Sequence, residues 1–256
     1  MPRPVLEIAV QDVAGYRVAA GAGAARVELC AALAATGGLT PSAGTLAGLV
    51  AERDALRTGR DAHDPATRGS APGIHVLVRP RPGSFVYDAD EVDVQVRDVE
   101  AAVAAGADGV VVGVLTPDGR VDVTALTRLV AAASDREITF HRAVDAVADP
   151  FAVLDALGAA GVTRVLTSGG AARSIDGVRR LAELVERTAG AVQVMAGGGV
   201  RPVDIRALVA AGVDAVHLSA SRPVAGDGGP GGGGAEGHTA TDPEVVAAAA
   251  AALDRA

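Results

Sequence analysis

The side chains that could do chemistry in this sequence lie at the ends of short apolar segments. Glu28 and His141 could each act as a general base, because carboxylates and imidazoles exchange protons near neutral pH when their surroundings adjust the pKa. Arg79 and Arg142 carry guanidinium groups, which bind carboxylates and phosphates through paired N–H donors. We expect these four residues to form a catalytic centre in which one base and two cations act on a small anion.

Two glycine-rich turns, 168–170 and 197–199, could bind the anionic part of such a substrate. Glycine lets backbone N–H groups approach a phosphate or carboxylate closely. The alternative is that both are ordinary turns between a strand and a helix. The expected anion site comprises Ser168, Gly197, Gly198, Gly199 and Ser219.

A metal site is a further possibility. Cys30, Met195 and His217 offer a thiol, a thioether and an imidazole, which are donors that suit Cu(I). The sequence has no second cysteine, so a copper ion at Cys30 needs Met195 or a histidine as its other ligand. The alternative is that the lone cysteine is a small buried hydrophobic residue.

Composition narrows the classes of function. The 256 residues carry a net charge of −8, from 31 acidic and 23 basic side chains, so we expect neither nucleic acid nor a membrane as partner. All basic side chains are arginines, and the absence of lysine excludes a Schiff-base mechanism. A single cysteine, no signal-peptide pattern and no apolar run of membrane-spanning length lead us to expect a cytoplasmic protein.

Short apolar segments rich in β-formers alternate along the chain with segments of helical periodicity. Helices are expected at 90–105, 150–160 and 175–188, among others. Alternating βα units indicate a parallel sheet, and eight units in about 250 residues predict an α/β fold, a single-domain (βα)8 TIM barrel. The eight strands are expected at 6–10, 26–30, 74–79, 109–115, 137–143, 164–168, 192–196 and 215–220.

An Ala-Gly-Ala/Val-x-x-Val pattern recurs four times, each time before a strand, with its glycine at Gly23, Gly106, Gly161 and Gly212. We expect each glycine to end a helix in the left-handed conformation, which is a structural role. Two segments fall outside this pattern. The sequence predicts a surface loop at 57–73 and a flexible Gly-rich insertion at 224–237, which could also act as a lid.

Alternation along the strands sorts their side chains between the two faces of the barrel. An apolar set that includes Ile8, Val27 and Phe140 should face the helices, and the alternate set should point inward. Because burying charge is costly, we expect at least one glutamate and Arg79 to form an internal ion pair. Arg142 has outward parity but follows a strand end, where the chain bends. The expected inward set is Glu7, Glu28, Cys30, His75, Arg79, Thr139, His141, Thr167, Gln193, Met195, His217 and Ser219.

Six segments together carry a resemblance to a known family: RVELC at 26–30, GGLTPS at 37–42, VRPR at 78–81, TFHRA at 139–143, RVLTSG at 164–169 and MAGGGV at 195–200. In this order they resemble the copper homeostasis family CutC, over about residues 6–219. The resemblance implies a cytoplasmic, homodimeric TIM-barrel protein with a role in copper homeostasis. It also implies Cu(I) binding, with Cys30 as the residue that best matches a proposed copper ligand.

Three functions follow from these observations. The first is copper homeostasis with Cu(I) at Cys30. The second is an enzyme of the lyase, isomerase or hydrolase type, acting on a small anionic or phosphorylated metabolite at the C-terminal mouth of the barrel. The third is a barrel that binds its ligand without catalysis. The inward polar residues favour the enzyme, because an acid, a base and guanidiniums converge there while sulfur ligands are few.

Overall fold

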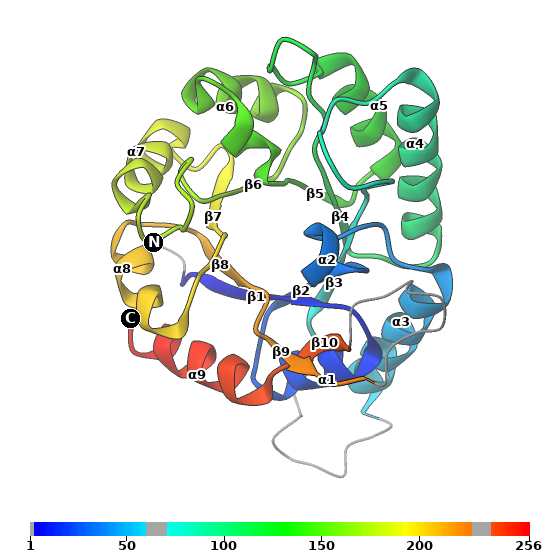
Figure 1. Ribbon diagram of the computed structural model, residues 1–256, viewed down its shortest axis with the longest axis vertical. Coiled ribbons are helices and arrows are strands. Elements are labelled where there is room, and N and C mark those ends of the chain that lie inside the picture. Colours follow the sequence, from blue (N-terminus) through cyan, green and yellow to red (C-terminus); the bar gives the residue numbers. More distant parts are fainter. Residues whose placement is uncertain (1–2, 60–70, 227–236) are drawn as a thin grey trace.

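The computed structural model describes residues 3–59, 71–226 and 237–256. Eight parallel strands close into a barrel in the order β1 to β8, which confirms the predicted TIM barrel in a single domain (Figure 1). The barrel strands are β1 (Val5–Val10), β2 (Arg26–Leu29), β3 (Gly73–Leu77), β4 (Gly109–Val112), β5 (Glu137–Phe140), β6 (Arg164–Thr167), β7 (Gln193–Ala196) and β8 (Ala215–Leu218).

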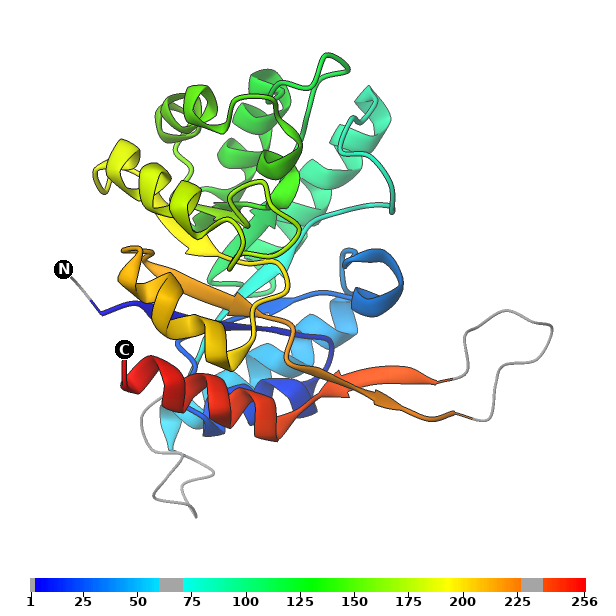
Figure 2. The ribbon, with the colours of Figure 1, turned by 60° about the vertical axis from the view of Figure 1, so that its left-hand side comes forward.

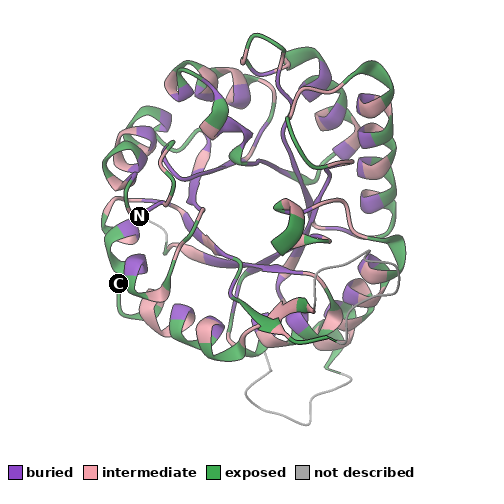
Figure 3. Cartoon of the chain, in the orientation of Figure 1, coloured by how far each residue is buried: buried purple, intermediate pink, exposed green. Residues whose placement is uncertain are grey.

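Helices surround the barrel and turn their buried faces toward it (Figure 3). Within the described ranges, no helix is both long and apolar enough to cross a membrane. The α-helices are α1 (Val13–Gly21), α2 (Leu33–Thr36), α3 (Ala43–Thr58), α4 (Ala89–Ala104), α5 (Val123–Ala133), α6 (Pro150–Ala159), α7 (Val178–Thr188), α8 (Ile205–Ala210) and α9 (Pro243–Asp254). Two short 3-10 helices, η2 (Arg142–Ala146) and η3 (Pro202–Asp204), follow β5 and β7.

Aspartates and glycines set the ends of many helices. An aspartate side chain accepts a backbone N–H in the first turn of α1, α4, α5, α6 and α9, which satisfies a donor that the helix leaves free. The four glycines of the repeated pattern adopt the left-handed conformation expected of them after a helix. Their φ angles are 77° at Gly23, 96° at Gly106, 91° at Gly161 and 87° at Gly212.

The outward face of the barrel follows the predicted alternation. Every member of the predicted outward set, including Ile8, Val27 and Phe140, lies in the main hydrophobic core between strands and helices. Strand β6 departs from the prediction for Thr167. Leu166 pairs in register with Met195 and packs with it in the barrel interior, whereas Thr167 donates a hydrogen bond to Asp145.

An ion-pair network fills the N-terminal part of the barrel interior. The guanidinium of Arg26 donates to Glu7 at 2.8 Å, to Thr139 at 3.2 Å and to Glu137. Arg164 donates to the same Glu137 at 3.1 Å. The predicted internal ion pair therefore exists, but Arg26 and Arg164 supply its cations instead of Arg79.

Regular structure extends into both segments predicted as irregular. Thr58 is the last residue of α3 and Gly73 the first of β3, while residues 60–70 and 227–236 lie outside the described part. The insertion is bounded by a two-stranded antiparallel hairpin, β9 (Ser221–Val224) and β10 (His238–Thr241), in which Val224 pairs with His238. This hairpin projects from the body of the molecule (Figure 2).

The buried network predicts a large effect of Arg26→Met on stability. This change leaves the buried Glu7 carboxylate without its guanidinium, and breaking one side of a buried ion pair costs about 3 kcal/mol or more. Arg128→Met is the matched control, because Arg128 and Asp93 form a pair that is nearly half exposed, which is worth less than about 1 kcal/mol. Urea denaturation measures both losses, and equal losses would contradict the assignment.

Candidate active site

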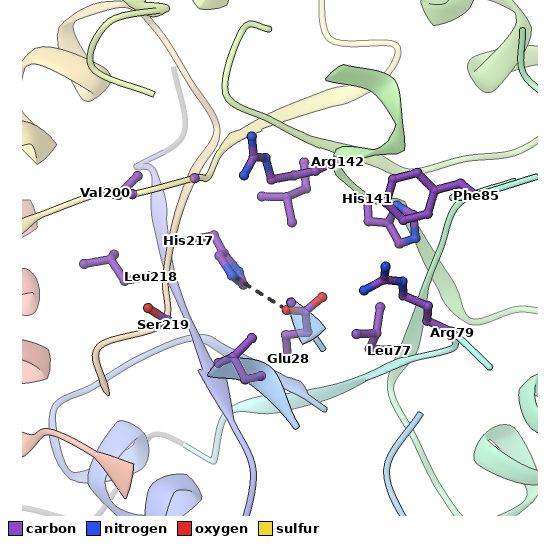
Figure 4. Close-up of a pocket in the computed structure, with 15 residues that line it drawn as sticks. Glu28, Leu77, Arg79, Phe85, His141, Arg142, Val200, His217, Leu218 and Ser219 are labelled. Carbon is purple, nitrogen blue, oxygen red and sulfur yellow. Dashed lines mark ion pairs between the residues drawn. The ribbon is translucent and has the colours of Figure 1, made fainter. Parts of the chain in front are cut away.

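A cavity of about 270 Å³ opens where the barrel strands end (Figure 4). It brings together all four residues predicted as catalytic, from β2, the segment after β3 and the turn after β5. Ser168, Gly197, Cys30 and Met195 do not line it. The predicted site residues that do line it are Glu28, Arg79, His141, Arg142, Gly198, Gly199, His217 and Ser219.

Glu28, His217 and Glu7 form a chain of contacts that leads from the cavity into the barrel. His217 Nε2 lies 3.6 Å from Glu28 Oε2, and His217 Nδ1 lies 2.8 Å from Glu7 Oε1. Strand register explains the arrangement, because Glu7 pairs with His217 on β8 and with Arg26 on β2. Glu28 reaches the cavity, whereas Glu7 has no exposed surface.

The charges of these groups depend on one another. Burial opposes ionisation of Glu7, but Arg26 and His217 outweigh it and hold the Glu7 pKa well below its usual range. Burial also opposes protonation of His217, yet the Glu7 hydrogen bond and the charge of Glu28 raise its pKa. Burial and the Glu7 charge raise the pKa of Glu28 to about 7 against His217 and Arg26. A histidine whose neighbours favour its charged form thus lies beside a carboxyl that exchanges its proton near neutral pH.

Arg79 is buried in the cavity wall without an acidic partner among the described residues. Three of its N–H groups donate to backbone carbonyls, those of Thr36 (2.8 Å), Gly38 (3.0 Å) and Gly83 (3.1 Å). Its guanidinium also stacks on Phe85, 5.1 Å from the ring centre. These contacts position the side chain but leave its positive charge uncompensated.

His141 is a neutral hydrogen-bond donor in the same wall. Burial and the charge of Arg79 lower its pKa to about 3. Its Nδ1 accepts the backbone N–H of Ala143 at 3.1 Å, so the proton of the neutral ring is on Nε2. The ring lies against Gly113, where a Cβ atom would come within 2.1 Å of it, so Gly113 has no side chain because His141 needs the space.

The glycine turn after β6 already holds a carboxylate of the protein itself. Asp145 accepts hydrogen bonds from Ser168 N and Gly170 N, at 3.1 Å each, and from Ser168 Oγ at 3.0 Å. Arg142 donates to the same carboxylate at 2.8 Å. This turn therefore binds an anion as its sequence suggests, but the anion is Asp145, and the predicted ligand contact of Ser168 is occupied by it.

The turn after β7 faces the cavity. Gly198 and Gly199 have φ angles of 112° and 61°, a backbone conformation that favours glycine. The Arg142 guanidinium lies so close that a Cβ on Gly198 would be 2.9 Å from its Cζ. Arg142 and this turn thus form one positively charged side of the cavity, although Arg142 was predicted with outward parity.

The predicted copper ligands lie in different surroundings, with His217 in the cavity lining. Cys30 is fully buried against Leu77 and Val111, and its thiol points to the Val10 carbonyl at 3.8 Å. Burial and the charge of Glu28 raise the thiol pKa, which disfavours the thiolate that binds metal. Met195 packs in a separate cluster. Over the described ranges, no group of three or more His, Cys, Asp or Glu side chains could hold a metal ion.

Several cavity residues could not be identified from strand alternation. Leu33 lies in α2, Phe85 in the segment before α4, and Val200 after β7, where no period of two applies. Asp145 does not line the cavity but contacts Arg142, which does; it follows the Phe140-His141-Arg142 segment, and its three-residue spacing from Arg142 was the available signal. Such a spacing is common in short helical turns, so it does not by itself indicate a site.

Comparisons of the sequence with known proteins agree on one family. The sequence model of the CutC family matches residues 4–222. A CutC family protein of Xanthomonas campestris pv. campestris is 44% identical over 221 residues, 86% of this chain and 85% of that protein. One of Agrobacterium fabrum is 41% identical over 218 residues, 85% of this chain and 79% of that protein.

Comparison with solved structures finds the same fold in a protein of this family and in other barrel proteins. A crystal structure from Streptococcus agalactiae, described provisionally as a copper homeostasis protein CutC, matches with a TM-score of 0.73 at 28% identity, covering 84% of this chain and 98% of that one. Thiamine phosphate pyrophosphorylase of Pyrococcus furiosus matches with a TM-score of 0.56 at 16% identity, covering 98% of this chain and 96% of that one. The second match reflects the barrel fold alone.

The raised pKa of Glu28 predicts a pH-dependent stability difference between the wild type and Glu28→Gln. The folded protein keeps the Glu28 proton up to pH about 7, whereas the unfolded chain loses it near the ordinary value of 4.5. The unfolding free energy of the wild type should therefore fall, relative to the variant, as pH rises through this window, by about 1 kcal/mol or more. Urea denaturation at a series of pH values measures it.

The control for this series is Glu183→Gln, which removes a carboxylate from the exposed face of α7 where Arg179 contacts it. A difference between Glu28→Gln and the wild type that stays constant from pH 4 to 8 would contradict the assignment.

Proposed function

The chain belongs to the CutC family, and we propose that its barrel mouth binds a small organic anion and exchanges a proton with it. In this proposal Glu28 accepts and returns the proton, His217 supports it, and Arg79 and Arg142 bind the anion. Such proton transfer is the basis of many lyase, isomerase and hydrolase reactions on small metabolites. The chain is thus an enzyme whose reaction takes place in the cavity.

One observation carries this proposal: Arg79 is buried, lines the same cavity as the titrating carboxyl of Glu28, and has no acidic partner among the described residues. An unpaired buried charge is unfavourable by several kcal/mol unless something compensates it. The backbone carbonyls around Arg79 supply partial charge only. An anionic ligand supplies the missing full charge, and the cavity beside Arg79 is where it fits.

The charge states favour Glu28 over His141 as the base. A general base works best when its pKa is near the working pH, which holds for Glu28 at about 7 and not for His141 at about 3. His217 is hydrogen-bonded to Glu7, which raises its pKa, and in its protonated form it can stabilise the ionised form of Glu28. The cavity, at about 270 Å³, lies at the small end of ligand sites and suits a substrate of few carbon atoms.

Copper homeostasis is the role that the description of the Streptococcus agalactiae protein suggests. The donor set around Cys30 gives it no support, because the thiol is protonated, fully buried and surrounded by aliphatic side chains. A copper-related role of this chain through Cys30 is therefore the weaker proposal.

Anion binding is tested by isothermal titration calorimetry with 2-phosphoglycolate, pyruvate and succinate. At least one should bind with one-to-one stoichiometry, and Arg79→Met should weaken it at least about tenfold, because a charge-assisted contact is lost. Arg222→Met, on the exposed strand β9, is the control with the same change of charge. Binding should also weaken as pH rises above about 7, where Glu28 ionises, and Glu28→Gln should remove this dependence. Absence of binding for all three would contradict the proposal.

Copper binding is tested by Cu(I) competition titration of the wild type and Cys30→Ala. We expect the same affinity for both, because the buried thiol is held away from solvent and ligands. A loss of stoichiometric binding in Cys30→Ala would show that the cysteine does bind copper.

A further inference from the structure

The Nε2 atom of His141 has no hydrogen-bond partner among the described residues, although the side chain is buried. The Ala143 N–H fixes the tautomer, so this atom carries a proton and can only donate. Buried N–H donors are nearly always paired in folded proteins. An unpaired donor in a cavity wall therefore points to an acceptor on the ligand.

The surroundings of His141 hold the ring in place and keep it neutral. The ring is held between Phe85, 4.7 Å away between ring centres, and the backbone of Gly113. Burial, together with the charge of Arg79, lowers the pKa of His141, so His141 does not gain a proton in the physiological range. A neutral imidazole N–H beside a guanidinium is suited to an oxygen that carries little charge in the substrate and more in the transition state.

The rest of the cavity provides the complementary groups. Glu28 lies in the same cavity wall as Arg79 and His141, as Figure 4 shows. Arg142 and the turn at Gly198 form its other positively charged side. The cavity thus has a donor pair for one oxygen, a base, and a separate cation for a permanent anionic group.

Building on the proposed function, we propose that the substrate is a small carbonyl compound with a carboxylate or phosphate group. His141 and Arg79 bind the carbonyl oxygen. Arg79 also contacts the anionic group, as in the proposed function, and Arg142 with the turn at Gly198 binds that group from the other side. Glu28 removes the proton from the carbon next to the carbonyl.

The step is balanced within the site. The carboxylate of Glu28 accepts the proton, the C–H electron pair becomes a carbon–carbon double bond, and the carbonyl π pair moves to oxygen. His141 Nε2–H and Arg79 stabilise the resulting enolate. Glu28 then returns the proton to the same carbon, so neither oxidant nor reductant is needed.

The test compares ketones with the matching alcohols. Calorimetry measures binding of pyruvate against L-lactate, and of dihydroxyacetone phosphate against sn-glycerol 3-phosphate. The two pairs distinguish a carboxylate from a phosphate as the anionic group. Proton NMR in D₂O then measures exchange of the hydrogens next to the carbonyl of the ketone that binds.

The expected result is that the ketone of one pair binds about tenfold tighter than its alcohol and exchanges its hydrogens, and that Glu28→Gln stops the exchange. His141→Phe should remove the preference for the ketone, while His141→Gln, which retains a donor, should keep most of it. Equal binding of ketone and alcohol, or a preference that survives His141→Phe, would overturn the carbonyl site and leave anion binding intact. No binding of any probe would overturn both proposals.

Discussion

The Glu7 carboxylate connects the two polar layers of the barrel interior. It has no exposed surface, and one of its oxygens accepts from Arg26 while the other contacts His217. The register of β1 with β2 and β8 places these three residues side by side, so a closed barrel and this contact require each other. A buried carboxylate persists only when both oxygens are satisfied. The structural network and the pair at the mouth therefore share one anion, and a residue that never reaches the cavity helps to raise the pKa of His217.

Strand alternation predicted most of the fold because the outward face must be apolar. Ile8, Val27 and Phe140 are apolar and therefore pack in the layer beneath the helices. The prediction failed at β6, where Arg164-Val165-Leu166-Thr167 has aliphatic residues at both parities, so the pattern alone cannot assign a face. Pairing with β7 decides it and turns Leu166 inward. The same ambiguity hid Arg164, whereas Arg26 shares the parity of Glu28 and could have been placed inward. The long side chains of both arginines reach partners on other strands.

The candidate site was predictable to the extent that it is built from strand ends. Glu28 and His217 follow from parity, because an inward residue at the C-terminal end of a strand opens on the mouth. Phe85 and Asp145 come from segments without periodicity, and only the folded chain brings them to β3 and β6. Residue type was informative but ambiguous. The glycine turn at 168–170 does bind a carboxylate, but no sequence pattern indicates that this carboxylate is a side chain of the protein itself. Cys30 is ambiguous for a related reason, since a thiol can be either a metal ligand or a small core residue.

Asp145 also limits the charge that Arg142 offers. It forms an ion pair with Arg142 but does not line the cavity, so the rim has less positive charge to offer than its arginines suggest. Under the proposed function, the anionic group of a ligand at Arg142 therefore competes with a carboxylate of the chain itself. An internal counter-charge of this kind weakens the attraction for a ligand while it holds the guanidinium in place.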